Sequence, residues 1–131
     1  YRQAPLNSIW EGSGNVICLD VLRAMGREPE ALSALRDELV AASGKDPRYD
    51  AFLESLEAEL QDKTTLEARA RRLVERLALA LQAAVLLQED GGAIAEAFLQ
   101  SRLVERHGTL GTLPHDAPVT LLIERAHPLR T

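Results

Sequence analysis

The stretch LALALQAAVLL, residues 77–87, decides how this chain folds. Its apolar residues cover nearly the whole circumference of a helix, which is typical of a helix with neighbours on all sides. The sequence before it is amphipathic from Thr64 or Thr65, either of which is a good helix N-cap, and the glycine pair at 91–92 ends the pattern. We therefore expect the longest helix to run to about Asp90 and to form the centre of a bundle.

The segment NVICLDVLRAM, residues 15–25, predicts a helix that precedes this central one. Ser13 and Asn15 are both suitable N-caps, and Gly26 is a suitable stop. Apolar residues occupy most of its surface, so we expect the helix to be buried on several sides. These residues are Val16, Ile17, Leu19, Val21, Leu22 and Met25.

Shorter helical patterns fill most of the remaining chain. One helix begins near Pro29 and ends at Gly44, and the next has Asp46 as its N-cap. Two more cover about 93–107 and 119–126. The helix after Asp46 places an apolar face on Tyr49, Phe52, Leu53, Leu56 and Leu60. Together these patterns predict an all-α fold, an antiparallel helical bundle of five or six helices with short connections.

Length and composition narrow the class of protein. The chain has 131 residues, 46% of them hydrophobic, and a net charge of −5, which suits one domain and disfavours non-specific binding to nucleic acid. Cys18 is the sole cysteine, so an internal disulfide is excluded and we expect a cytoplasmic protein. No apolar run reaches the roughly 18 residues of a membrane span, so no membrane partner is expected. Because the sequence lacks an initiator methionine and opens on YRQAPLNSIW, we expect it to be a piece of a longer protein.

The segment WEGSGN, residues 10–15, combines an aromatic, a carboxylate and two glycines just before the first helix. Gly12 allows a sharp bend and the close approach of another group, and a helix start favours an anion such as phosphate. Glu11 next to the bulky Trp10 would have its pKa raised by an apolar site, which suits a general base. An ordinary glycine turn before a capped helix explains the same residues, and both interpretations stay open.

The longer segment APLNSIWEGSGNVICLDVLRAM, residues 4–25, resembles the C-terminal helical domain of the acyl-CoA dehydrogenase family. That family has an aromatic-Glu-Gly-Thr/Ser segment in front of a long helix. The tryptophan, the GSGN continuation and CLDVLR look like the AidB branch, the flavoproteins of the adaptive response to DNA alkylation. The resemblance implies that residues 1–26 end that helical domain and that residues 27–131 are an appended helical region packed with it.

The resemblance also implies roles for the opening residues. Glu11 would occupy the place of the glutamate that abstracts the α-proton of a fatty acyl-CoA while flavin takes the β-hydride. Trp10, Gly12, Ser13 and Asn15 would lie near the flavin cofactor, although Asn15 departs from the glutamine usual in the family. FAD is expected in the full-length parent and not in this fragment. Some branches take their base from another helix, so the identity of the base stays open.

A second functional hypothesis rests on three arginines at helical spacing, Arg69, Arg72 and Arg76. Such a row can meet the phosphates of DNA, and the resemblance supports this because the AidB branch binds DNA. Carboxylates four residues on either side of the adjacent Arg71 can instead make this a salt-bridged face. The alternative to a dehydrogenase domain is therefore a DNA-binding or oligomerisation module with little turnover. The expected partners are the other domains of the parent, acyl-CoA, further copies in a homo-oligomer, and DNA.

The remaining reactive residue types give no sign of a metal site or of a nucleophile. His107, His115 and His127 are far apart, with no carboxylate or cysteine at metal-ligand spacing. Cys18 lies in an apolar run without a histidine partner, so we expect it to be inert core.

Overall fold

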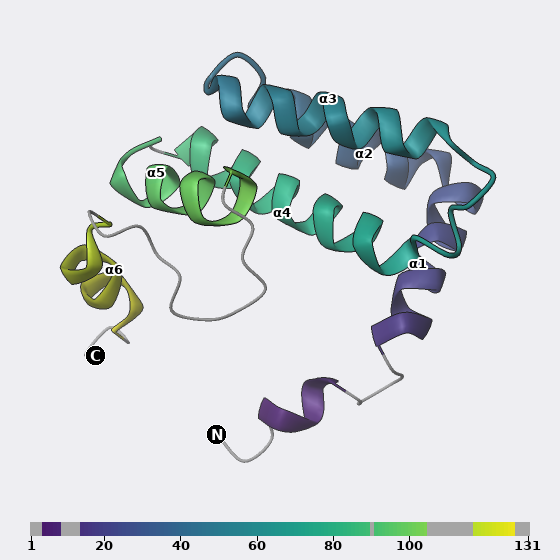
Figure 1. Cartoon of the computed structure of the whole chain (residues 1–131), viewed down its shortest axis with the longest axis horizontal. Coiled ribbons are helices and arrows are strands. Elements are labelled where there is room, and N and C mark those ends of the chain that lie inside the picture. The colour runs from purple at the N-terminus through teal and green to yellow at the C-terminus, as the bar shows by residue number, and fades with distance from the viewer. Residues whose placement is uncertain (1–3, 9–13, 90, 105–116, 128–131) are drawn as a thin grey trace.

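The computed structural model describes residues 4–8, 14–89, 91–104 and 117–127, and within these ranges the chain contains helices and no strand. The prediction of an all-α bundle is confirmed (Figure 1). A short 3₁₀ helix comes first, six α-helices follow, and α5 continues into a π-helical turn. The elements are η1 (Ala4–Ser8), α1 (Gly14–Arg27), α2 (Pro29–Val40), α3 (Pro47–Gln61), α4 (Ala70–Glu89), α5 (Ala93–Leu99), η2 (Gln100–Val104) and α6 (Val119–Ala126).

Helix α4 is the centre of the bundle, as the apolar stretch at 77–87 predicts. Helices α1, α2, α3 and α5 all pack against it. Figure 1 shows α2 and α3 above α4, with α1 at the N-terminal end of α4 and α5 beside its C-terminal end. The centre is not enclosed all round, because Val85 in the apolar half of α4 is 40% exposed.

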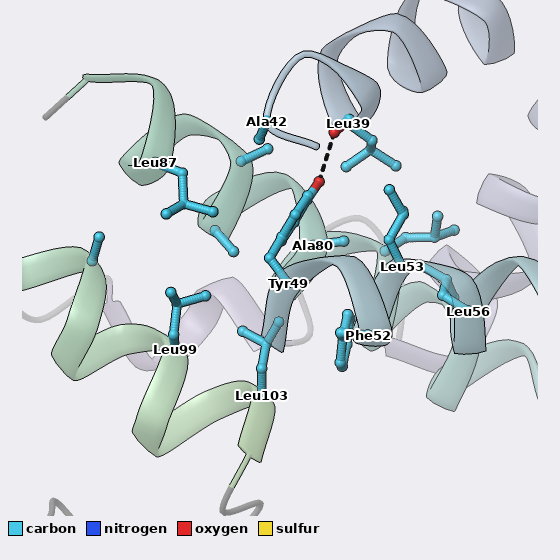
Figure 2. Close-up of a cluster of buried hydrophobic side chains, with 14 of the residues drawn as sticks. Leu39, Ala42, Tyr49, Phe52, Leu53, Leu56, Ala80, Leu87, Leu99 and Leu103 are labelled. Carbon is cyan, nitrogen blue, oxygen red and sulfur yellow. Dashed lines mark hydrogen bonds between the residues drawn. The ribbon is translucent and has the colours of Figure 1, made fainter. Parts of the chain in front are cut away.

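The hydrophobic core lies where α2, α3, α4 and α5 meet (Figure 2). Tyr49 is fully buried there, and its hydroxyl donates a hydrogen bond of 2.8 Å to the carbonyl oxygen of Leu39, near the end of α2. Burial, together with the nearby charges of Asp50 and Glu38, raises the pKa of Tyr49 to about 12. The predicted apolar face of α3 is confirmed. Its buried members are Tyr49, Phe52, Leu53 and Leu56, and Leu60 is partly buried.

The cap of α3 is also confirmed. The carboxylate of Asp46 accepts a hydrogen bond of 2.8 Å from the backbone N–H of Arg48, and this arginine binds Glu96 of α5 through both of its terminal nitrogens at 2.7 and 2.5 Å. The hydrogen bonds from Arg48 hold the pKa of Asp46 below its usual value. The turn before the cap needs a glycine, since Gly44 has a φ of 80°. One short segment thus closes the turn, starts α3 and ties it to α5.

The expectation that α1 is buried on several sides is wrong. Cys18 is its one buried residue, while Val16 and Ile17 are 48% and 43% exposed. In the described part of the chain α1 packs mainly on α4 and α2, and these two neighbours leave Val16 and Ile17 about half exposed.

The start of α4 also differs from the expectation. Neither Thr64 nor Thr65 is its N-cap, because α4 begins at Ala70 and residues 64–69 form turns. The carboxylate of Asp62 accepts hydrogen bonds from the N–H and the hydroxyl of Thr64, at 3.1 and 2.5 Å. Thr64 therefore donates its hydrogen bonds to Asp62, just after α3, and does not cap α4. Turns at residues 64–69 come before α4.

Candidate functional site

The segment singled out by sequence lies immediately before α1. Trp10, Glu11, Gly12 and Ser13 are outside the described residues, so their predicted roles stay predictions. The described part of the site begins with Gly14 and Asn15, the first two residues of α1.

Asn15, a predicted cofactor contact, is joined to the beginning of α4. The Nη1 atom of Arg71 donates a hydrogen bond of 3.0 Å to Oδ1 of Asn15. A β-carbon at Gly14 would lie 3.0 Å from the same nitrogen, so the absence of a side chain at Gly14 gives the guanidinium its place. The N-terminal end of a helix carries partial positive charge, and Arg71 adds a full one. This corner of the molecule therefore favours an anionic group.

Arg71 was missed as a site residue by the sequence reasoning, which paired it with carboxylates on its own helix. It contacts a residue 56 positions away, and no local spacing reveals such a contact. One sequence signal was available: Arg71 lies next to the row of Arg69, Arg72 and Arg76 but on a different face of the helix, so it could contact a different element.

The three arginines of that row converge on one carboxylate, Glu59 of α3. Arg76 forms an ion pair with Oε1 of Glu59, and Arg72 forms one with Oε2 at 3.0 Å. Arg69, just before α4, lies 4.0 Å from Oε2 and also pairs with Asp62 at 3.3 Å. The face is thus salt-bridged to α3 through Glu59, and Asp62 is a further partner of Arg69.

Arg76 is not on a solvated surface. Its side chain is 9% exposed, and its guanidinium lies 4.6 Å from the centre of the Phe52 ring. Its Nη2 atom donates to Oγ of Ser55 at 3.0 Å, whereas Nε has no partner among the described residues. Arg72 is 55% exposed, the most open of the three. Contact between these arginines and DNA stays a prediction.

Other reactive groups are scattered. Within the described ranges no three residues among histidine, cysteine, aspartate and glutamate gather as metal ligands would. Cys18 is buried, as expected of a core residue. His127 follows α6 and is exposed, while His107 and His115 lie outside the described residues. No helix in the described part of the chain combines the length and the apolar character needed to cross a bilayer.

Comparison with known proteins places these features in context. No family model matches the chain, and no solved structure matches it. Over 108 residues the chain is 34% identical to a protein of Escherichia coli strain K12 named "Putative acyl-CoA dehydrogenase AidB". The aligned part is 82% of this chain and 20% of that protein, so the chain spans about a fifth of the length of this curated relative. The similarity thus extends well beyond the opening 26 residues, to most of the bundle.

Proposed function

We propose that this chain is the C-terminal helical part of an acyl-CoA dehydrogenase-like FAD flavoprotein of the AidB branch. In this proposal it contributes one wall of the flavin and acyl-CoA site, and the longer protein supplies the others. The observation that carries the proposal is the corner formed by Gly14, Asn15 and Arg71, directly after the segment with Glu11. The 34% identity with the AidB protein of Escherichia coli supports it.

The corner suits the diphosphate of a dinucleotide cofactor. Free N–H groups in the first turn of a helix and a neighbouring guanidinium are both favourable to phosphate oxygens. The guanidinium of Arg71 fills the space in front of Gly14, and its charge therefore lies beside the first turn of α1. When bound, FAD supplies the acceptor for a hydride. Glu11, three residues before Gly14, would then take the α-proton of the acyl group.

The exposed apolar residues of α1 support the proposal that further domains enclose the site. Val16 and Ile17 follow the corner directly and are each nearly half exposed. Burying an exposed apolar side chain contributes roughly 25 cal/mol per Å² of surface removed from water. We infer that the remaining domains of the longer protein pack against this side of α1 and thereby enclose the site.

The cofactor proposal is tested by Arg71→Gln in the full-length flavoprotein, with Arg72→Gln as the matched control on the same helix. Removing the charge next to Asn15 should weaken FAD binding by about 10-fold, the scale of one lost charge-assisted hydrogen bond. The control should keep full flavin absorbance, because Arg72 points to Glu59 instead. Equal flavin content in both variants would remove Arg71 from the cofactor site. A full-length protein without flavin affinity would refute the proposed function itself.

The catalytic part is tested by Glu11→Gln in the same full-length protein. If Glu11 is the general base, oxidation of acyl-CoA should fall by about 10²-fold or more while flavin content is unchanged. Glu28→Gln is a suitable control, because Glu28 is an exposed carboxylate just beyond the far end of α1. Undiminished turnover in Glu11→Gln would assign the base to another residue.

A further inference from the structure

Helix α6 has no buried residue, whereas each of the other five α-helices in the described ranges has at least one. Its large apolar side chains Val119, Leu121 and Ile123 are 48%, 42% and 56% exposed, and Figure 1 shows the helix at the edge of the molecule. Isolated helices shorter than about 12–15 residues are marginal in water, and α6 has eight. The stability of α6 therefore depends on a surface that covers it.

One side of α6 faces the bundle loosely. Leu121 and Arg125, one helical turn apart, line a hollow of about 340 Å³ at the junction of α4 and α5. The Nη2 atom of Arg125 lies 3.7 Å from Oε2 of Glu89, and both side chains are more than half exposed. An exposed ion pair of this kind contributes little, and the hollow shows that α6 is not packed tightly on the junction.

The apolar face of α6 lies elsewhere on the helix. Four apolar residues recur at positions i, i+3, i+4 and i+7, which places them along one face. This α6 face consists of Val119, Leu122, Ile123 and Ala126. At 3.6 residues per turn, its members Val119 and Ile123 lie about 160° around the helix from Leu121 and Arg125. The same spacing occurs in amphipathic helices that dock in an apolar groove of another surface.

The size of the α6 face indicates what can cover it. Eight residues form a helix about 12 Å long and about 10 Å wide, which covers about 120 Å². A specific complex of separate proteins buries about 800 Å² on each partner, so α6 by itself is too small to hold a second copy or an unrelated protein. A surface on the same polypeptide needs less contact, because the covalent connection gives it an effective concentration of about millimolar.

Most of the relative's length lies outside the part that this chain matches, which is one fifth of the AidB protein. We propose that the α6 face docks in an apolar groove on the other domains of the longer protein, within the same polypeptide. The inference rests on the proposed function, in which this chain is one part of a longer flavoprotein. In this arrangement α6 ties the far end of the helical region back to the flavin-binding domains, while the exposed Val16 and Ile17 contact them at the start of α1.

Hydrogen exchange in the full-length flavoprotein tests whether the α6 face is covered. The amides of residues 119–126 should exchange at least about 10-fold more slowly than unprotected amides. Val119→Gln combined with Ile123→Gln should abolish this protection, because glutamine is a good helix former but cannot be buried without a hydrogen-bond partner. Thr120→Gln combined with Glu124→Gln is the control, at the same spacing on another side of the helix, and should leave the protection unchanged. An unprotected α6 in the wild type, or equal protection in the two variants, would overturn the proposal.

A photo-crosslink identifies the surface that covers α6. Benzoylphenylalanine is placed at position 123 in full-length protein assembled from isotopically labelled and unlabelled chains, and the linked peptides are identified by mass spectrometry. Links to another domain of the same chain support the proposal. Links between labelled and unlabelled chains, links to α1–α5, or the absence of any link would each overturn it. Failure of the proposed function is separate, since it appears as a full-length protein without flavin, whereas a flavin-containing protein with an uncovered α6 contradicts the docking of α6 alone.

Discussion

Replacing Glu59 by glutamine should destabilise the chain much more than the loss of an exposed carboxylate would. Glu59 is the anionic partner of Arg76, whose side chain is only 9% exposed. Glutamine keeps the shape and one acceptor oxygen but removes the charge that compensates the buried guanidinium. Leaving one member of a buried ion pair alone costs roughly 3–5 kcal/mol. Arg76 retains its hydrogen bond to Ser55 and its contact with the Phe52 ring, so we expect a loss of about 3 kcal/mol, at the lower end of that range.

Urea unfolding followed by circular dichroism measures this loss directly. A chain of this length has a free energy of unfolding of roughly 7–20 kcal/mol, so the change is easily resolved. Arg72→Gln is the matched control. The Arg72 side chain is 55% exposed, so its ion pair with Glu59 should contribute less than about 1 kcal/mol to the free energy of unfolding. Replacing both Glu59 and Arg76 by leucine should recover most of the stability, since no buried charge is then left alone. If Glu59→Gln cost no more than Arg72→Gln, the dependence of Arg76 on Glu59 would be refuted.

Two further predictions follow from titrating groups around α3. Tyr49→Phe should lose about 1 kcal/mol at neutral pH with its buried hydrogen bond. Burial raises the pKa of Tyr49 to about 12 in the folded chain, above the ordinary tyrosine value of about 10. The free energy of unfolding of the wild type should therefore fall by up to about 2–3 kcal/mol as pH rises from about 10 to 12. Urea titrations should show no such fall in the phenylalanine variant. Asp46→Ala should cost about 1 kcal/mol with the helix cap. Arg48 lowers the pKa of Asp46 in the folded chain. The extra stability of the wild type over the alanine variant should therefore be complete above the ordinary aspartate pKa and disappear as pH falls through the pKa of Asp46 in the folded chain. Equal acid sensitivity of wild type and variant would contradict this.

The parts of the fold that local sequence determines were predictable. The apolar face of α3 recurs at helical spacing, and the cap of α3 depends on Asp46 and a backbone group two residues away. Such features need no knowledge of the rest of the molecule. The start of α4 was mistaken because a competing local partner, Asp62, takes the hydrogen bonds of Thr64.

Features that join distant segments were not predictable in the same way. An apolar residue in a helix pattern indicates which side prefers burial, but the exposure of Val16 depends on which neighbours the bundle provides. The contact of Arg71 with Asn15 and that of Arg76 with Glu59 each require two helices to be placed first. For the candidate site, the sequence predicted the segment at 10–15 and, within the described residues, Asn15. Arg71, the positive partner of Asn15, could be found only from the packing of α1 on α4.

The central position of α4 has a consequence for how the chain is made. Helices α1, α2 and α3 precede α4 in the sequence, yet each of them packs against it. On the ribosome they emerge before the surface that stabilises them, and helices of 12 to 15 residues are marginal on their own in water. At about 5–20 residues per second, the 20 residues of α4 take about 1–4 s to appear. During that interval the apolar faces of three helices stay open to chaperones and to neighbouring nascent chains, and the bundle forms only once synthesis has passed residue 89.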